Sequence, residues 1–414
     1  MLMTFDTLIN SDINIIRKVV QQKESGILHM KILITTEWYT PVINGVVNSV
    51  LILQRKLQEM GHEVRILTLS HCNQSSMEGN VTYIGARNAS WIYPEARVAF
   101  HMNSSFMEDI IEWKPDVIHS QCEFSTFLMA RRLAKKLDIP IVHTYHTVYE
   151  DYTHYFFPNK RIGRVMVSFL TKGVIRRTSY VIAPTDKVKN MLMGYGIKQD
   201  IMVVPTGIDL HNFNILQDKE KLQKLRAKIG ISDGNKVLIS IGRLGKEKNL
   251  EEIISFLERL QNPEITLVIV GDGPYRSNLE SLVKELRLEK QVKFTGMVSP
   301  DEVADYYKLG DVFVCASISE AQGLTYMEAL AVGVPALCRK DPCLNNVVID
   351  GVNGWQYTSY EHFADRLTAI LYQEDLHKTL SMNAHNLVLQ EYSSIAFAKK
   401  VSQVYEKSIA NKGH

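Results

Sequence analysis

The sequence predicts an α/β protein made of two domains, each with a doubly wound parallel sheet. Short apolar runs, typical of buried parallel strands, alternate with segments whose apolar residues recur at helical spacing. This alternation breaks near residues 204–209 and then restarts. The length of 414 residues is too great for one ordinary core and fits two domains. We therefore expect one domain over residues 30–205 and a second over residues 206–392.

The expected elements follow in order along each half of the chain. In the first domain, a helix should end at Gly61, because glycine commonly terminates helices. The first domain's expected strands are 31–36, 63–68, 116–119, 139–143 and 180–183, and its helices 46–60 and 129–137. The second domain's expected strands are 236–241, 265–270, 292–294, 311–316 and 336–338, and its helices 250–260 and 323–331. Two such domains would face each other across a cleft at the carboxyl ends of their strands, where ligands bind in this class of fold.

Composition excludes several classes of protein. The chain carries 47 Lys and Arg against 45 Asp and Glu, a net charge of +2, which does not indicate a dedicated nucleic-acid-binding protein. No apolar run approaches the ~18 residues needed to span a bilayer. The 5 cysteines are widely spaced and form no C-x-x-C pair. This pattern argues against a disulfide framework or a zinc site and favours a reducing cytosol.

Residues 1–29 lack the sustained apolar core of a signal peptide and carry charges throughout. The segment over residues 13–20 is compatible with a short amphipathic helix. Alternatively, Met30 is the natural start and the preceding residues are incidental. We expect residues 1–29 to form an appendage outside the main fold.

Two acids, Glu320 and Glu328, lie eight residues apart with Gly323 between them. Glu320 ends the loop after an expected strand, and Glu328 lies inside the helix that follows. The amino end of such a helix offers free N–H groups and a positive dipole end to an anion or a sugar hydroxyl. By spacing alone, a loop acid followed by an ordinary helix acid explains the pattern equally well.

Two further loops have the chemistry of a phosphate site. Arg243 and Lys248 follow a buried strand, and a planar guanidinium beside a point ammonium suits a diphosphate. Gly45 lies in the first strand-to-helix loop, where a residue without a side chain lets the backbone approach a phosphate. Taken singly, a solvated charged loop and a plain turn glycine are the simpler interpretations.

Polar and aromatic residues are unusually dense over residues 144–155, directly after an expected strand. A loop of this kind at the carboxyl end of a strand is a candidate wall for an acceptor site, with Tyr149 and Tyr152 as candidate contacts. His146 lies in the same segment. A histidine with a purely structural role is the alternative interpretation.

Together these motifs resemble family 4 of the retaining, nucleotide-sugar-dependent glycosyltransferases with the GT-B fold. The resemblance runs from Met30 to about the C-terminus. Its most specific part is the acid-x7-acid motif with Gly-Leu-x-x-x-Glu-Ala-Leu-Ala-x-Gly-x-Pro, from Glu320 to Pro335. It implies two Rossmann-like domains facing a cleft, the first binding the acceptor and the second the nucleotide sugar. We also expect a helix over about residues 393–414 to return to the first domain.

The resemblance also implies roles for individual residues. It places the backbone of Gly45 against the donor diphosphate, which Arg243 and Lys248 neutralise. It assigns Glu320 to the hydroxyls of the donor sugar, Glu328 to the ribose and His146 to a position near the reacting carbon. Gln322, Gly323 and Leu324 complete the donor-binding segment.

One departure from the family pattern is informative. Many members carry Phe where this chain has Gln322. The form Glu-x-Gln-Gly-Leu-Thr-Tyr, together with residues 146–152, looks like the bacterial 1,2-diacylglycerol 3-alpha-glucosyltransferase branch.

A basic amphipathic segment, residues 156–177, favours a lipid acceptor. Basic residues alternate there with apolar ones and no acid interrupts them, a pattern typical of membrane-surface helices. The candidate membrane contacts are Lys160, Arg161, Arg164, Phe169 and Lys172. The alternative is a helix that packs on the first domain and leaves a solvated basic face.

The resulting hypothesis is a hexosyltransferase that moves glucose from a UDP-sugar to diacylglycerol at the inner face of the cell membrane. No Asp-x-Asp pair occurs in the sequence, so we expect no metal and no other cofactor, with the cations and helix N–H groups stabilising the leaving diphosphate. We expect retention by a same-face attack. One alternative is a soluble glycosyltransferase acting on a small metabolite or a cell-wall or glycan polymer, and another is a non-catalytic nucleotide-sugar-binding protein. No nucleic-acid partner is expected.

Overall fold

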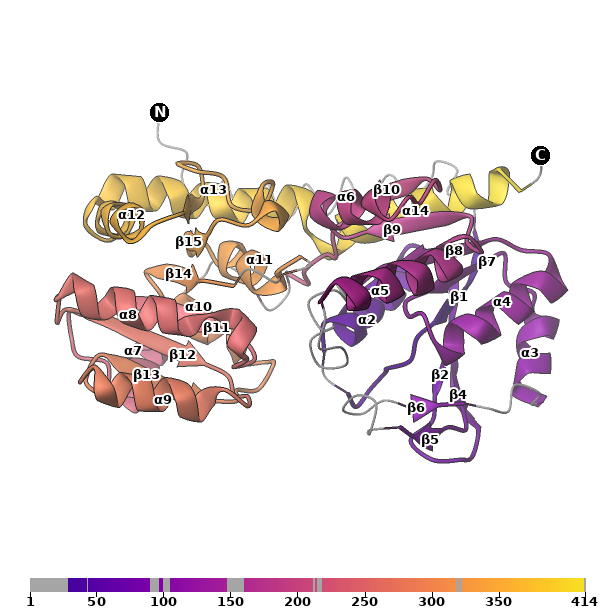
Figure 1. Ribbon diagram of the computed structural model, residues 1–414, viewed down its shortest axis with the longest axis horizontal. Helices are drawn as coiled ribbons and strands as arrows, with labels where there is room; N and C mark the ends of the chain where they lie inside the picture. The colour runs from indigo at the N-terminus through magenta and orange to yellow at the C-terminus, as the bar shows by residue number, and fades with distance from the viewer. Residues whose placement is uncertain are drawn as a thin grey trace.

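The computed structural model describes residues 29–42, 44–89, 97–99, 105–146, 160–210, 213, 218–317, 320 and 322–412, without the side chains of residues 160–164. The chain forms two α/β domains that lie side by side, each built on its own mostly parallel sheet (Figure 1). This confirms the predicted fold class. Within the described residues, no helix is long and apolar enough to cross a membrane.

The first domain contains an eight-stranded sheet in the order β10-β9-β8-β7-β1-β2-β4-β3. Its strands are β1 (Lys31–Thr35), β2 (Glu63–Leu69), β3 (Ser76–Glu78), β4 (Val81–Ile84), β7 (Val117–Ser120), β8 (Ile141–Thr144), β9 (Tyr180–Ala183) and β10 (Ile201–Val203). All neighbours pair in parallel except β3 and β4. The helices are α2 (Gly45–Glu59), α3 (Ser105–Trp113), α4 (Ser125–Leu137), α5 (Lys160–Ile175) and α6 (Asp186–Gly194), and β5 (Arg87–Asn88) pairs with β6 (Arg97–Val98) apart from the main sheet.

The second domain contains a six-stranded parallel sheet in the order β13-β12-β11-β14-β15-β16. Its strands are β11 (Lys236–Ile241), β12 (Ile265–Val270), β13 (Val292–Gly296), β14 (Val312–Cys315), β15 (Ala336–Arg339) and β16 (Gly354–Tyr357). Its helices are α7 (Lys219–Ile229), α8 (Leu250–Leu260), α9 (Arg276–Glu285), α10 (Val303–Lys308), α11 (Leu324–Ala331), α12 (Tyr360–Tyr372) and α13 (Glu374–Glu391), with 3₁₀ turns η3 (Lys246–Lys248) and η4 (Pro342–Leu344).

The last helix, α14 (Ser394–Ala410), lies against the first domain although it follows the second in sequence (Figure 1). Phe397, Val401 and Tyr405 are buried in the core formed by β1, β2 and α2. The Tyr405 hydroxyl lies 2.6 Å from Nδ1 of the buried His119 on β7, whose Nε2 lies 2.7 Å from the Thr144 hydroxyl. These buried contacts fix α14 to the sheet of the first domain, so the chain passes between the domains twice.

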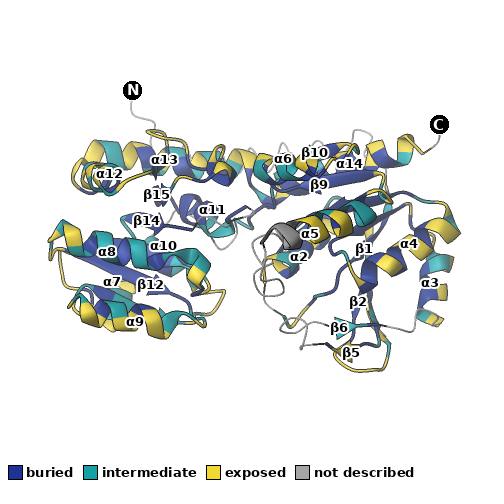
Figure 2. Ribbon diagram, in the orientation of Figure 1, coloured by how far each residue is buried: buried dark blue, intermediate teal, exposed yellow. Residues whose placement is uncertain are grey.

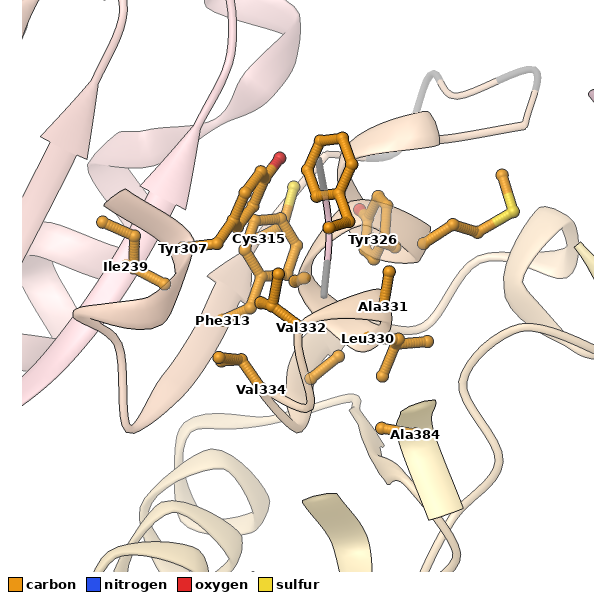
Figure 3. Close-up of a cluster of buried hydrophobic side chains, with 14 of the residues drawn as sticks. Ile239, Tyr307, Phe313, Cys315, Tyr326, Leu330, Ala331, Val332, Val334 and Ala384 are labelled. Atoms are coloured by element: carbon orange, nitrogen blue, oxygen red, sulfur yellow. The ribbon is translucent and has the colours of Figure 1, made fainter. Parts of the chain in front are cut away.

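Helix α11, which carries Glu328, is held by one of the largest hydrophobic clusters in the second domain. Tyr326 and Leu330 of α11 are buried beside Phe313 of β14, with Ala384 of α13 in the same cluster (Figure 3). The Tyr326 and Phe313 rings meet edge to face with centroids 5.4 Å apart, an arrangement favoured by the ring quadrupoles. The backbone that presents Glu328 is therefore rigid on the side facing the core.

Gly323, immediately before α11, has a left-handed backbone with φ of 74°. A Cβ atom at this position would lie 2.6 Å from Cδ2 of the buried Tyr326 ring. Glycine avoids both the left-handed penalty and this clash. It thereby lets the chain turn sharply from the loop of Glu320 into the helix of Glu328.

Candidate functional site

The candidate site lies where the amino ends of α2 and α11 approach each other from the two domains. A Cβ atom placed on Gly45 would lie 3.9 Å from Cδ1 of Leu324, so these two predicted donor residues are neighbours across the domain boundary. Asn44 caps α2 by accepting a hydrogen bond from the Val47 N–H at 2.9 Å. Two helix amino ends of positive potential thus converge on one place, which favours a bound anion.

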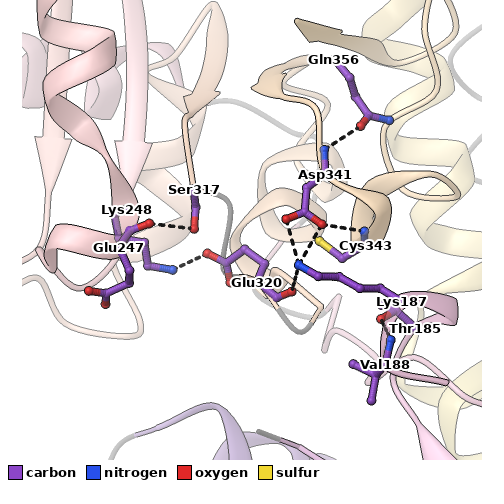
Figure 4. A network of polar contacts seen from close by, with 10 residues as sticks. All are labelled: Thr185, Lys187, Val188, Glu247, Lys248, Ser317, Glu320, Asp341, Cys343 and Gln356. Carbon is purple, nitrogen blue, oxygen red and sulfur yellow. Dashed lines mark hydrogen bonds and ion pairs between the residues drawn. The ribbon is translucent and has the colours of Figure 1, made fainter. Parts of the chain in front are cut away.

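Lys248 and Glu320, 72 residues apart, meet in this region and form an ion pair (Figure 4). Lys248 ends η3 after β11, and Glu320 lies on the loop between β14 and α11. Burial alone would lower the pKa of Lys248, but the Glu320 carboxylate raises it above its ordinary value. The lysine is therefore a firmly charged cation beside an acid, and a bound phosphate would compete with Glu320 for it.

Arg243 lies on the same loop as Lys248 and pairs with a different acid. Its guanidinium pairs with Glu247 of η3, and its side chain is 53% exposed. The Glu247 backbone carbonyl in turn accepts a hydrogen bond from the Ser317 hydroxyl at 3.4 Å (Figure 4). An exposed ion pair of this kind contributes little to stability, so Arg243 can exchange Glu247 for another anion at small cost.

Glu328 accepts a hydrogen bond from the Tyr307 hydroxyl at 2.7 Å. Burial raises the pKa of Glu328, and the hydrogen bond from Tyr307 partly offsets this effect. Burial and the neighbouring Glu328 both raise the pKa of Tyr307, so the phenol keeps its proton and acts as the donor. Tyr307 therefore fixes one carboxylate oxygen and leaves the other with acceptor capacity for a hydroxyl group.

The side chain of Gln322 points to the linker between the domains. Its amide oxygen accepts from the Thr206 N–H at 2.9 Å, its amide nitrogen donates to the Thr206 carbonyl at 2.9 Å, and the side chain is buried. This bidentate contact engages both polar atoms of the side chain. A donor contact at this position would therefore come from the Gln322 backbone.

His146 follows β8 and is oriented by Gln121, which follows β7. Its Nε2 lies 2.6 Å from the Gln121 side-chain oxygen. Burial and the nearby His143 lower the pKa of His146 to about 3, so the ring is neutral near pH 7. Because the amide oxygen can only accept, Nε2 carries the proton and Nδ1 is left as a hydrogen-bond acceptor.

The exposed face of α5 is apolar and basic. The side chains of Val165, Phe169 and Leu170 are 69%, 76% and 61% exposed, which is unusual for residues of this size. Phe169 and Lys172 also line a hollow of about 400 Å³ between α5 and α6, together with Val165, Ser168, Gly194 and Tyr195. Figure 2 shows exposed residues along α5 and along the neighbouring α4 in the same view.

The face continues from α5 onto α4. Burial and the nearby Arg177 both lower the pKa of Arg131, so the middle of α4 lies near the basic residues that follow α5. Helix α4 adds exposed cations and, at its amino end, exposed apolar side chains. These residues are Phe124, Leu128, Arg131, Arg132, Lys135 and Lys136.

Five of the predicted contacts cannot be placed. Tyr149 and Tyr152 lie outside the described residues, and of Lys160, Arg161 and Arg164 only the helical backbone is described. Their acceptor and membrane roles therefore remain predictions. Among the described residues, no group of His, Cys, Asp and Glu side chains is arranged to hold a metal ion.

The sequence did not identify the residues that hold the site together. Tyr307 fixes Glu328, Gln121 orients His146, and Lys187 contacts the backbone of Glu320 from the other domain. These partners are separated by 21, 25 and 133 residues along the chain. A weak signal was present: Gln121 and His146 each lie within three residues of the end of a predicted strand, and such positions share one edge of a parallel sheet.

Comparison with known proteins identifies the family of the chain. The sequence-family model described as Glycosyltransferase Family 4 matches residues 43–212. The family model described as Glycosyl transferases group 1 matches residues 222–408. An alpha-monoglucosyldiacylglycerol synthase of Streptococcus pneumoniae is 38% identical over 385 residues, which cover 92% of this chain and 86% of that protein. The enzyme of the same name from Acholeplasma laidlawii is 32% identical, covering 91% of this chain and 96% of the relative.

Solved structures support the fold. HepE from Anabaena in complex with UDP-glucose superposes with a TM-score of 0.71 at 17% identity, covering 92% of this chain and all of the other. Sucrose-phosphate synthase from Thermosynechococcus elongatus superposes with a TM-score of 0.73 at 19% identity and 92% coverage of this chain. The chain has two Rossmann-like domains, and its relatives match nearly its whole length. This protein therefore belongs to family 4 of the glycosyltransferases and has the GT-B fold.

Proposed function

We propose that this protein transfers glucose from UDP-glucose to diacylglycerol, with retention of anomeric configuration, at the inner surface of the cell membrane. The observation that carries the donor half is the meeting of Lys248 and Glu320 beside the converging amino ends of α2 and α11. The names of the two relatives with 38% and 32% identity support a glucosyl lipid as product.

The donor would lie across the domain junction. In this proposal Lys248 leaves Glu320 for the diphosphate, and Arg243 leaves Glu247 for the same group. The freed Glu320 carboxylate then accepts hydrogen bonds from the glucose hydroxyls, while Glu328, held by Tyr307, accepts from the ribose. In the bound state both cations pair with the phosphates, and hydrogen bonds from the glucose hydroxyls replace Lys248 at the Glu320 carboxylate.

Transfer then requires the leaving diphosphate to be stabilised. The acceptor hydroxyl oxygen bonds to the anomeric carbon on the face from which the diphosphate departs. The bond from that carbon to the phosphate oxygen breaks, and the hydroxyl proton passes to the departing phosphate. Arg243, Lys248 and the amino end of α11 supply positive potential where the negative charge develops. We propose that these groups do so without a metal ion, and that neutral His146 accepts a sugar hydroxyl hydrogen bond through Nδ1.

The acceptor half of the proposal rests on the apolar and basic face of α4 and α5. Exposed Phe169 and Leu170 would enter the lipid interface, while Lys172, Arg176 and Arg177 would contact anionic headgroups. The hollow beside Phe169 offers apolar surface to part of a lipid chain. A protein placed on the membrane in this way meets an acceptor that is itself insoluble in water.

Calorimetry with UDP tests the donor half. Replacing Arg243 or Lys248 by alanine should weaken UDP binding about tenfold or more, because each change removes a charge-assisted hydrogen bond to phosphate. Lys246→Ala is the matched control, since Lys246 is an exposed lysine of the same 3₁₀ turn. Unchanged UDP affinity in both the Arg243 and Lys248 variants would show that this loop does not bind the diphosphate.

A further inference from the structure

Lys187 is the one residue of the first domain that Figure 4 shows reaching the loop of Glu320. It lies in the first turn of α6, whose amino end is capped by the Thr185 hydroxyl accepting from the Val188 N–H at 3.4 Å. Its ammonium group donates to the Glu320 backbone carbonyl at 3.1 Å and to the two Asp341 carboxylate oxygens at 3.0 and 2.9 Å. A single side chain thus contacts two separate loops of the second domain.

Asp341 is a fixed point of the second domain. Its side chain is buried, and Oδ1 also accepts from the Cys343 N–H at 2.8 Å at the start of η4. The Asp341 N–H donates to the Gln356 side-chain oxygen at 3.3 Å. A buried carboxylate needs a cation or several donors to remain charged, and here the cation comes from the other domain.

The loop that carries Glu320 is therefore held from the first domain and the linker at two points. Lys187 holds the Glu320 carbonyl, and Thr206 holds the side chain of Gln322 two residues later. The carboxylate of Glu320 is held separately, by Lys248 of the second domain. The backbone position of Glu320 thus depends on the relative placement of the domains, whereas its charge partner does not.

We propose that Lys187 is a positioning residue for Glu320, and that it makes the sugar part of the donor site complete only when the two domains are closed on each other. This inference rests on the proposed role of Glu320 at the donor sugar. When the domains separate, Lys187 leaves both Asp341 and the Glu320 carbonyl, and the loop loses one of its two anchors. Arg243, Lys248 and Glu328 lie wholly within the second domain, so the nucleotide part of the site remains.

This arrangement separates nucleotide binding from sugar transfer. Lys187→Met keeps the apolar stem and removes the charge. This substitution should leave UDP affinity unchanged but lower kcat for transfer by about ten- to hundredfold. A small displacement of a catalytic group causes a disproportionately large loss of rate. The ratio of the affinity for UDP-glucose to the affinity for UDP, which reports the contribution of the glucose group to binding, should fall as well. Lys187→Arg retains the charge and two or more donors, and should restore part of the lost rate.

The matched control is Lys189→Met, a lysine of the same helix that lies outside the network of Figure 4. Lys187→Ala serves as a second variant, and UDP binding reports that either variant is folded. If Lys187→Met transfers glucose as fast as Lys189→Met, or if UDP affinity and transfer fall in parallel without rescue by arginine, the positioning role is refuted. If the unaltered protein binds no UDP, the proposed function itself fails and this inference with it.

Discussion

Replacing Glu320 by glutamine should lower turnover by about 10²-fold or more while the protein stays folded, because the loss of one preorganised polar group at a transition state commonly has this effect. The substitution keeps the size of the side chain and removes its charge. The carboxylate is largely buried and pairs with Lys248, so its position is defined before the donor arrives. The neutral amide accepts hydrogen bonds from sugar hydroxyls more weakly than a carboxylate does.

Steady-state transfer kinetics and UDP calorimetry together measure this effect. UDP affinity should hold or rise in Glu320→Gln, because Lys248 is freed from its internal partner for the phosphates. Glu285→Gln, at an exposed position on α9, is the matched control for the same chemical change. Turnover of Glu320→Gln close to that of Glu285→Gln would remove Glu320 from the reaction.

Reversing Lys172, Arg176 and Arg177 to glutamate should release the protein from anionic vesicles. Each basic residue near such a surface contributes about 1 kcal/mol, so losing three lowers binding by about 10²-fold before any repulsion is counted. Sedimentation with vesicles of phosphatidylglycerol measures the change. Transfer to lipid acceptor should fall with binding, whereas UDP affinity should not change because the donor residues are untouched.

The second domain offers a control with the same change in net charge. Lys284, Arg287 and Lys290 are exposed basic residues at and beyond the end of α9, on the other domain (Figure 1). Their reversal to glutamate should affect vesicle binding far less. The binding that persists at high salt should fall in Phe169→Ser and Leu170→Ser. Interactions between exposed charges are screened beyond about 10 Å at 0.1 M salt, whereas apolar insertion is not screened. If the variant with Lys172, Arg176 and Arg177 reversed to glutamate binds vesicles as well as the unaltered protein, the basic face is only solvated. A soluble acceptor then becomes the better hypothesis.

Most of the parallel strands could be predicted from the sequence because most of them are short apolar runs buried on both faces. The expected strands at 180–183, 236–241 and 265–270 and the helix at 250–260 match the structure at both ends. The edge strand β3 has three exposed residues and leaves no apolar pattern. β3 pairs with β4 as an exposed antiparallel edge strand, and such a pairing leaves no periodic pattern in the side chains of β3.

The site was predictable where a motif is contiguous and unpredictable where it depends on tertiary contacts. Glu320, Gly323 and Glu328 share one loop and helix, so their spacing is informative. The pairing of Lys248 with Glu320 joins two loops of the second domain, and the contact of Lys187 with Asp341 joins the two domains. Gln322 shows the converse case: it lies within the motif, yet its side chain is bonded to Thr206 of the linker.

Product analysis of a single reaction shows whether the protein transfers glucose to diacylglycerol. The unaltered protein is incubated with UDP-glucose and vesicles of diacylglycerol and phosphatidylglycerol, with a chelator of divalent ions present throughout, and the lipid phase is extracted. We expect a monoglucosyl diacylglycerol whose anomeric proton shows the α configuration by NMR. Glucose that remains entirely in the aqueous phase, although the protein binds UDP-glucose, would contradict it.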